Sequence, residues 1–61
     1  MKRYLYKNIV LKPSYRMWDA YYKICTNGKY NTMFLLASGF RTKKDAYIGG
    51  KAEVDYLNEK P

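Results

Sequence analysis

The stretch Thr26-Asn27-Gly28-Lys29, together with Ser38-Gly39-Phe40-Arg41-Thr42-Lys43-Lys44-Asp45-Ala46, decides the fold of this chain. Asn-Gly is typical of a two-residue hairpin turn, because both central residues of a type I′ turn need a positive φ. In the second stretch, Thr42 can cap a helix by accepting a hydrogen bond from the backbone N–H of Asp45. The negative carboxylate of Asp45 would also be stabilised by the positive N-terminal end of the helix dipole. The two stretches therefore predict a hairpin, a corner and a helix, in that order.

Apolar patterning predicts three strands, over residues 2–12, 17–25 and 30–37. In the second strand, one alternating set should face the core and the other should face away, because successive side chains point to opposite sides of a sheet. The inward set is Trp18, Ala20, Tyr22 and Ile24, and the outward set is Asp19, Tyr21, Lys23 and Cys25. The first strand has apolar residues in both sets, so its inward face stays undecided, and Pro13-Ser14 should end it.

A helix should follow over residues 43–58. One side of it carries an apolar stripe that would pack on the sheet, namely Ala46, Tyr47, Gly50, Val54 and Leu57, whereas Ile48, Ala52 and Tyr56 lie on the far side. The small residues Ala46 and Gly50 would let the helix approach a bulky side chain, with Trp18 as the best candidate. Gly49-Gly50 is also the weak point, where the helix could kink, since each mid-helix glycine costs up to about 1 kcal/mol relative to alanine.

This order of elements is βββα. We expect an α+β fold in which a three-stranded antiparallel sheet packs on one C-terminal helix, in a single small domain over residues 1–61. A domain of this size buries only about 60% of the surface that its unfolded chain exposes. Cys25 is the only cysteine, so no disulfide framework adds stability, and a lone cysteine suits a reducing cytoplasm. The chain has no apolar run long enough to span a bilayer and no signal-peptide pattern, so we expect a soluble cytoplasmic protein with no membrane partner.

Charge is distributed unevenly along the chain. Residues 1–44 contain ten Lys and Arg against one acid, a net charge of +9, whereas residues 45–61 contain two against four, a net charge of −2. The strand-rich part is therefore basic and the helical part mildly acidic. Basic surface on one structural element is the electrostatic footprint of a polyanionic partner. Solubility is the simpler explanation of a net charge, but it does not explain why the charge follows the elements.

The sequence gives little support for a catalytic function. The chain has no histidine for proton transfer near neutral pH, and its acids are not paired in a recognisable way. Gly49-Gly50 lacks the flanking residues of a phosphate-binding loop. The absence of histidine and the single cysteine exclude an ordinary structural zinc site. We expect a protein that is not an enzyme and that needs no cofactor or metal.

Binding chemistry is better supported. Lysine and arginine supply phosphate contacts, and aromatic or amide side chains on the same face can stack on bases or read their edges. Eight tyrosines add amphipathic surface of the kind that is common at binding faces. The candidate nucleic-acid-binding residues are Arg16, Tyr21, Lys23, Lys29, Asn31, Arg41, Lys43 and Lys44. Each of them alone is better explained as a solvated surface side chain, so the set is more informative than its members.

Three motifs resemble those of a known family. Trp18-x-Ala20-x-Tyr22, Asn27-Gly28-Lys29 and the segment from Gly39 to Ala46 look like the arm-type, AP2-like DNA-binding domains at the N-termini of phage and transposon tyrosine integrases. The resemblance covers residues 17–57, and only the last segment is fairly specific. It implies a sheet that enters the major groove with the helix behind it. By position, Tyr21, Lys23, Lys29 and Asn31 would face DNA, and Arg41, Lys43 and Lys44 would lie near phosphates.

The third strand departs from that family, because Met33-Phe34-Leu35-Leu36 is much more apolar than its usual polar and basic counterpart. Such a run indicates a strand covered on both sides or one that presents an apolar patch to a partner. The alternative function is therefore a phage-encoded protein-interaction module that inhibits or modulates a host protein or a ribonucleoprotein, with Met33 and Leu35 at the interface. A homodimer through residues 33–37 is compatible with either function. RNA is a third candidate partner, since charge does not distinguish it from DNA.

Overall fold

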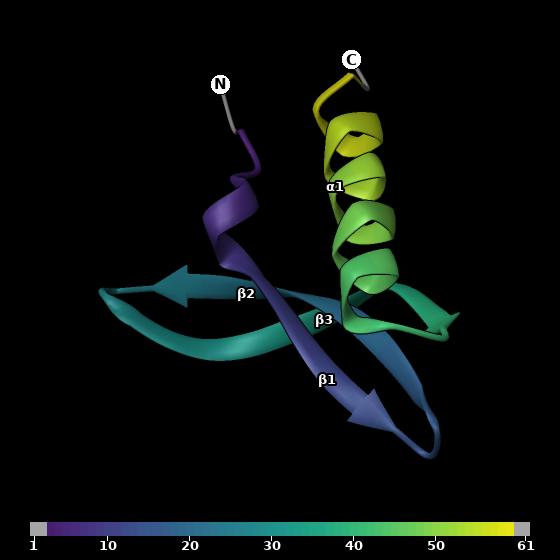
Figure 1. Cartoon of the computed structure of the whole chain (residues 1–61). Helices are drawn as coiled ribbons and strands as arrows, with labels where there is room; N and C mark the ends of the chain where they lie inside the picture. Colours follow the sequence, from purple (N-terminus) through teal and green to yellow (C-terminus); the bar gives the residue numbers. More distant parts are fainter. Residues whose placement is uncertain (1–2, 60–61) are drawn as a thin grey trace.

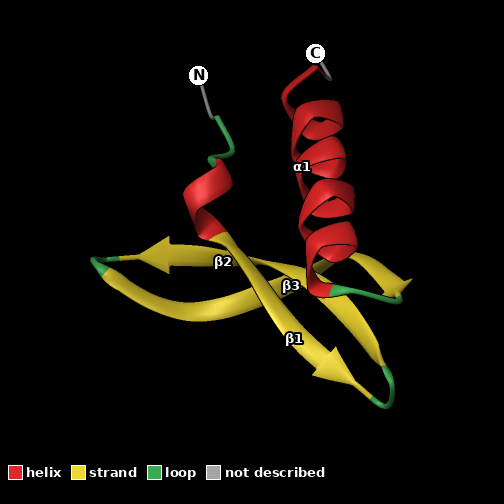
Figure 2. Ribbon diagram, in the orientation of Figure 1, coloured by secondary structure: helices red, strands yellow, loops and turns green. Residues whose placement is uncertain are grey.

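Three antiparallel strands form one sheet, and one helix packs against it. The computed structural model describes residues 3–59, apart from the side chains of Thr26, Tyr30 and Asn31. The elements are a 3₁₀ turn η1 (Tyr6–Asn8), strands β1 (Ile9–Ser14), β2 (Met17–Thr26) and β3 (Lys29–Phe40), and helix α1 (Lys43–Glu59). The sheet has the order β1-β2-β3. In Figures 1 and 2, α1 and the N-terminal segment rise from the same side of this sheet. The predicted βββα fold is confirmed.

The limits of β1 differ most from those predicted. The prediction of a strand over residues 2–12 is wrong in its first half, because the strand begins only at Ile9. Residues 6–8 form η1 instead, where the Asn8 N–H donates to the Leu5 carbonyl at 3.1 Å. Pro13 does not end the strand but pairs with Trp18. Because β1 is an edge strand, a proline there can turn its missing N–H away from the partner strand. β3 continues to Phe40, beyond the expected end at residue 37.

Two hairpin turns join the strands, and the sequence predicted one of them. Asn27 and Gly28 have φ values of 53° and 80°, as a type I′ turn requires. The turn between β1 and β2 also places two consecutive residues at positive φ, Tyr15 at 49° and Arg16 at 69°. These residues lack the usual turn signal, and the left-handed conformation costs non-glycine residues about 1–2 kcal/mol. The Tyr15 side chain is 90% exposed at the tip of this turn.

Small residues bring α1 close to the sheet. Ala20, Ala46 and Val54 have no exposed surface. A Cβ atom added at Gly50 would lie 3.0 Å from the Ala20 Cβ and 3.3 Å from the Ile9 Cγ2. The expectation that Trp18 lies beneath this part of the helix is therefore wrong. Alanine allows a closer approach than a tryptophan ring would.

The faces of α1 largely follow the predicted pattern. Ala46, Gly50 and Val54 are buried, and Leu57 is half-buried against the core. Tyr47 is an exception: it was expected in the packed stripe but is 39% exposed. On the opposite side of α1, Ile48, Ala52 and Tyr56 are exposed as expected. The helix continues without a break through Gly49-Gly50, and each of these glycines fits against a neighbouring side chain.

The N-terminal segment is held by side chains from distant parts of the chain. The Tyr4 N–H donates to the Asn58 Oδ1 at 2.8 Å, and the Asn58 Nδ2 donates back to the Tyr4 carbonyl at 3.1 Å. The Tyr22 hydroxyl accepts from the Leu5 N–H at 3.0 Å and from the Asn8 Nδ2 at 3.2 Å. These bonds satisfy backbone groups that a strand would otherwise pair, which explains why the segment leaves the sheet.

One further contact joins η1 to α1. The Tyr6 hydroxyl donates a hydrogen bond to the Asp55 carboxylate, and this bond raises the pKa of Tyr6 above its ordinary value. The Lys51 Nζ lies 5.1 Å from the centre of the Tyr6 ring. The phenol therefore contacts two charged side chains of the helix.

Replacing Gly49 with alanine should destabilise the fold by about 1–3 kcal/mol, although alanine favours a helix. The reason is steric, because the added methyl group would overlap the end of the Phe40 ring. In a Phe40→Ala background the same replacement should stabilise the protein by up to about 1 kcal/mol. Urea unfolding of the four proteins measures this difference, and an equal effect of Gly49→Ala in both backgrounds would contradict it.

Alkaline pH should weaken the attachment of η1. Tyr6 has a raised pKa in the folded protein, so its contribution to stability is complete below the unfolded pKa of about 10 and is lost as pH rises through the folded value. Between pH 8 and pH 11, as rough limits, Tyr6→Phe should therefore lose less stability than the wild type. Tyr15→Phe is the matched control, and it should retain the full wild-type loss. Identical pH dependence in all three proteins would rule out this role of Tyr6.

Candidate nucleic-acid interface

One face of the sheet is turned away from α1. Directly opposed residues of an antiparallel pair share a face, so the register assigns both sides of the sheet. Ile9 and Leu11 pair with Tyr22 and Ala20 on the helix side. The opposite side, which we call the open face, carries Val10, Lys12, Ser14, Met17, Asp19, Tyr21, Lys23, Met33 and Leu35. Within residues 3–59, α1 and the N-terminal segment both lie on the other side of the sheet (Figure 1).

The open face combines cations with apolar groups. Tyr21 lies in its middle, opposite Val10 on β1 and Leu35 on β3. The Lys12 Nζ lies 5.6 Å from the centre of the Tyr21 ring, a distance at which a cation is attracted to an aromatic face. Lys23 is opposite Met33. Met33 and Leu35 are 40% and 52% exposed, so this part of the surface is apolar and accessible.

Asp19 is the one acid on the open face, and its carboxylate is used locally. The register passes from Trp18–Phe40 to Ala20–Ala37, so two residues of β3, Ser38 and Gly39, oppose Asp19 alone. This irregularity is a β-bulge, and Gly39 takes a φ of +84° within it. The Gly39 N–H donates to the Asp19 Oδ1 at 3.2 Å. The hydrogen bond satisfies an N–H that the bulge leaves out of the ladder.

Only some of the predicted binding residues come together. Tyr21 and Lys23 share the open face with Met33 and Leu35. Arg16 lies in the turn between β1 and β2, and Lys29 begins β3 at the other end of the sheet. The Asn31 side chain lies outside the described part of the structure. Its backbone falls where the pairing shifts between Ile24 and Cys25.

The three predicted basic residues between β3 and α1 lie in different places. Arg41 follows the end of β3, beside the paired residues Trp18 and Phe40, at the end of the sheet that also carries Arg16. Lys43 points elsewhere, because its Nζ lies 5.6 Å from the centre of the Trp18 ring on the helix side. Lys44 is exposed next to it in the first turn of α1. Thr42 caps this turn as predicted, accepting from the Asp45 N–H at 3.0 Å.

Sequence reasoning missed Lys12 and Val10. Both lie on β1, whose inward face the apolar pattern left undecided. A two-residue turn at Tyr15 and Arg16 fixes the register and so pairs Lys12 with Asp19, but these two residues carry no turn signal from which the sequence could have predicted it. Lys12 adds a second lysine to the open face.

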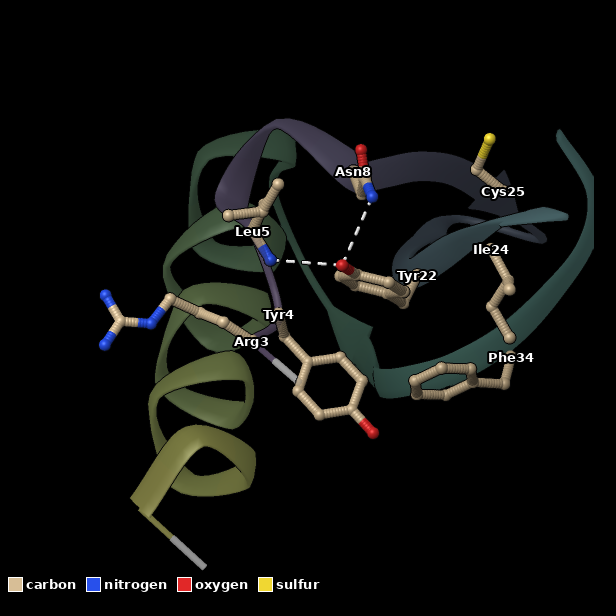
Figure 3. Close-up of a pocket in the computed structure, with 8 residues that line it drawn as sticks. All are labelled: Arg3, Tyr4, Leu5, Asn8, Tyr22, Ile24, Cys25 and Phe34. Carbon is tan, nitrogen blue, oxygen red and sulfur yellow. Dashed lines mark hydrogen bonds between the residues drawn. The ribbon is translucent and has the colours of Figure 1, made fainter. Parts of the chain in front are cut away.

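A pocket lies on the helix side of the sheet, between the N-terminal segment, the end of β2 and the first half of β3 (Figure 3). Its volume is about 330 Å³. The rings of Tyr4 and Phe34 flank Tyr22, with centroids 5.2 Å and 5.4 Å from its own. Figure 3 shows the Arg3 guanidinium pointing away from these rings. The Tyr22 hydroxyl already accepts two hydrogen bonds, so this pocket is best explained as the seam where the N-terminal segment packs.

Comparisons with family models, curated proteins and solved structures found no match. Over the described residues, no helix has the length and hydropathy needed to cross a membrane. The same part of the chain contains no group of three or more His, Cys, Asp or Glu side chains that could hold a metal ion. These comparisons assign no function to the open face, so its interpretation rests on its geometry and charge.

The bulge predicts different effects of two replacements at Asp19. Asp19→Ala should cost about 0.5–1.5 kcal/mol of stability, because the Gly39 N–H exchanges its protein acceptor for water. Asp19→Asn keeps an oxygen in the same place and should stay within about 0.5 kcal/mol of the wild type. Thermal unfolding followed by circular dichroism makes the comparison. Equal losses in the two variants would show that the carboxylate charge, and not the hydrogen bond, stabilises the bulge.

Proposed function

We propose that this chain is a small basic DNA-binding module of phage or mobile-element type, and that it contacts duplex DNA through the open face. The observation that carries the proposal is the placement of Lys12 and Lys23 around Tyr21 on a sheet face that no other described element covers. Cations on such a face supply phosphate contacts, and the aromatic and apolar groups between them reach base edges.

The ends of the sheet extend this basic surface. Arg16 and Arg41 lie at one end and Lys29 at the other, on a molecule with principal extents of 36 × 25 × 14 Å. A single DNA-binding module buries about 600–1,000 Å² of protein surface, which fits a molecule of these dimensions. The cations at both ends would contact phosphates on either side of a groove, and the middle of the face would enter it.

The helix supports the sheet without contacting DNA in this arrangement. α1 packs against the side of the sheet opposite the open face (Figure 1), and the segment after residue 44 has a net charge of −2. The resemblance to arm-type integrase domains is consistent with a sheet in the major groove and a helix behind it. One residue departs from that correspondence, since Lys43 contacts Trp18 on the helix side and lies away from the open face.

A protein partner is the second candidate, and the exposure of Met33 and Leu35 favours it. In that case the open face would bind a host protein or ribonucleoprotein that presents an apolar patch bordered by acids. A second copy of the chain is a related candidate. A tight complex of fixed stoichiometry, formed by a protein that does not bind duplex DNA at low salt, would favour this function over the first.

Salt and charge reversal test the proposal. Binding of labelled duplex DNA, followed by fluorescence anisotropy, should weaken steeply with salt; about five phosphate contacts give a log–log slope of about −4 to −5. Lys23→Glu should weaken binding by on the order of tenfold at 0.1 M salt, as a rough estimate.

Lys7→Glu is the matched control for this experiment. Lys7 is exposed in η1, away from the open face, so the variant has the same net charge as Lys23→Glu but should bind DNA much more tightly. Equal losses in the two variants would mean that net charge alone attracts the DNA. Duplex RNA should bind more weakly than DNA of the same sequence, because its deep, narrow major groove does not admit a sheet.

A further inference from the structure

The middle of the open face carries apolar side chains that cannot bind phosphate groups. Met33 and Leu35 are 40% and 52% exposed, and Leu35 lies beside Tyr21. Phosphate oxygens accept hydrogen bonds and attract cations, so thioether and alkyl groups gain nothing from them. If the face binds DNA, the bases are the part of the duplex that these two side chains can contact favourably.

The major groove offers one prominent apolar group, the C5 methyl group of thymine. The remaining groups that the bases present there are hydrogen-bond donors and acceptors, which an apolar side chain would desolvate without replacing their bonds. We propose that Met33 and Leu35 contact thymine methyl groups, so that the protein selects duplexes with methyl groups in the major groove. This inference rests on the proposed function and names the chemistry that it reads.

The spacing of the two side chains matches that of stacked bases. Met33 and Leu35 are two residues apart on one face of β3, which puts their Cα atoms about 6.6–6.8 Å apart. Two base-pair steps rise by the same distance along the axis of the duplex, at about 3.4 Å each, and the helical rotation of the duplex adds to the separation of the methyl groups. When β3 follows the groove, the two side chains therefore lie over neighbouring base pairs and can contact methyl groups one to two base pairs apart.

The neighbouring charges favour DNA over an apolar protein as the occupant. Lys23 is opposite Met33, and Lys12 lies over the ring of Tyr21, which is opposite Leu35. An apolar partner that covered Met33 and Leu35 would also desolvate these ammonium groups, which is costly without counter-charges. A DNA groove supplies phosphates beside its methyl groups, so it satisfies both kinds of side chain.

Four hairpin-capped duplexes isolate the methyl group. Alternating d(AT) has methyl groups two base pairs apart on each strand, and alternating d(AU) differs from it only by their absence. Alternating d(GC) and the same duplex with 5-methylcytosine form the second pair. Fluorescence anisotropy at one salt concentration should show at least about threefold tighter binding to the methylated member of each pair.

The same titrations on variants assign the effect to residues. In Met33→Gln/Leu35→Gln the preference should fall to about onefold in both pairs, while salt-dependent binding remains. Leu35→Thr, a smaller change that suits a strand, should lower the preference partially. Ile48→Gln is the matched control, because Ile48 is 54% exposed on the far side of α1. It should leave the preference unchanged.

Each other outcome counts against the inference. Salt-dependent binding with equal affinity for methylated and unmethylated duplexes would overturn it and leave the proposed function standing. A preference that survives in the folded double variant would overturn the assignment to Met33 and Leu35. No binding to any of the duplexes at low salt would overturn the inference and the proposed function together, and a protein surface would then be the occupant to seek.

Discussion

The structure depends on the close approach of α1 to β2 at Ala20 and Gly50. A side chain at position 50 would meet the Ala20 Cβ at 3.0 Å and the Ile9 Cγ2 at 3.3 Å, so the helix lies as near to the sheet as its backbone permits. Ala46 and Val54 extend this contact and have no exposed surface. Because the chain is short, this helix-to-sheet contact provides most of its core, and larger residues at these positions would separate the two layers.

The same arrangement leaves the other side of the sheet for a partner. The described residues form two layers only, so side chains that alternate away from α1 remain accessible. Lysines next to an aromatic ring make this surface suitable for a polyanion, and Met33 and Leu35 add an apolar centre. The Asp19 carboxylate accepts a hydrogen bond from the β3 bulge. Lys12 and Lys23 outnumber this acid, so the face remains basic, and the hydrogen bond stabilises its shape where β3 bends.

Local signals predicted the parts of the fold that local interactions determine. Asn27-Gly28 forms the expected turn, Thr42 caps the helix, and the alternation in β2 separates Ala20 and Tyr22 from Tyr21 and Lys23 as expected. These features depend on neighbouring residues alone. In the candidate site, period-two patterning placed Tyr21 and Lys23 together on the side opposite Trp18, as observed. The third strand was apolar on both faces, so the pattern did not show that Met33 and Leu35 lie opposite Lys23 and Tyr21.

The features that sequence reasoning missed depend on distant residues or on backbone strain. The N-terminal segment leaves the sheet because of bonds to Tyr22 and Asn58, which are far away along the chain. The turn at Tyr15 and Arg16 uses positive φ without glycine, and it determines where Lys12 lies. Trp18 was placed wrongly beneath Gly50, since the position at which a helix crosses a sheet is a tertiary property.

The most direct test of the account is an NMR titration of the ¹⁵N-labelled protein with duplex DNA. The account predicts that the backbone amides of the open face, in particular Tyr21, Lys23, Met33 and Leu35, shift on addition of DNA. Amides on the far side of α1, such as Ile48, should not shift. Shifts confined to the helix, or spread evenly over all basic residues, would contradict the claim that the open face is the binding surface.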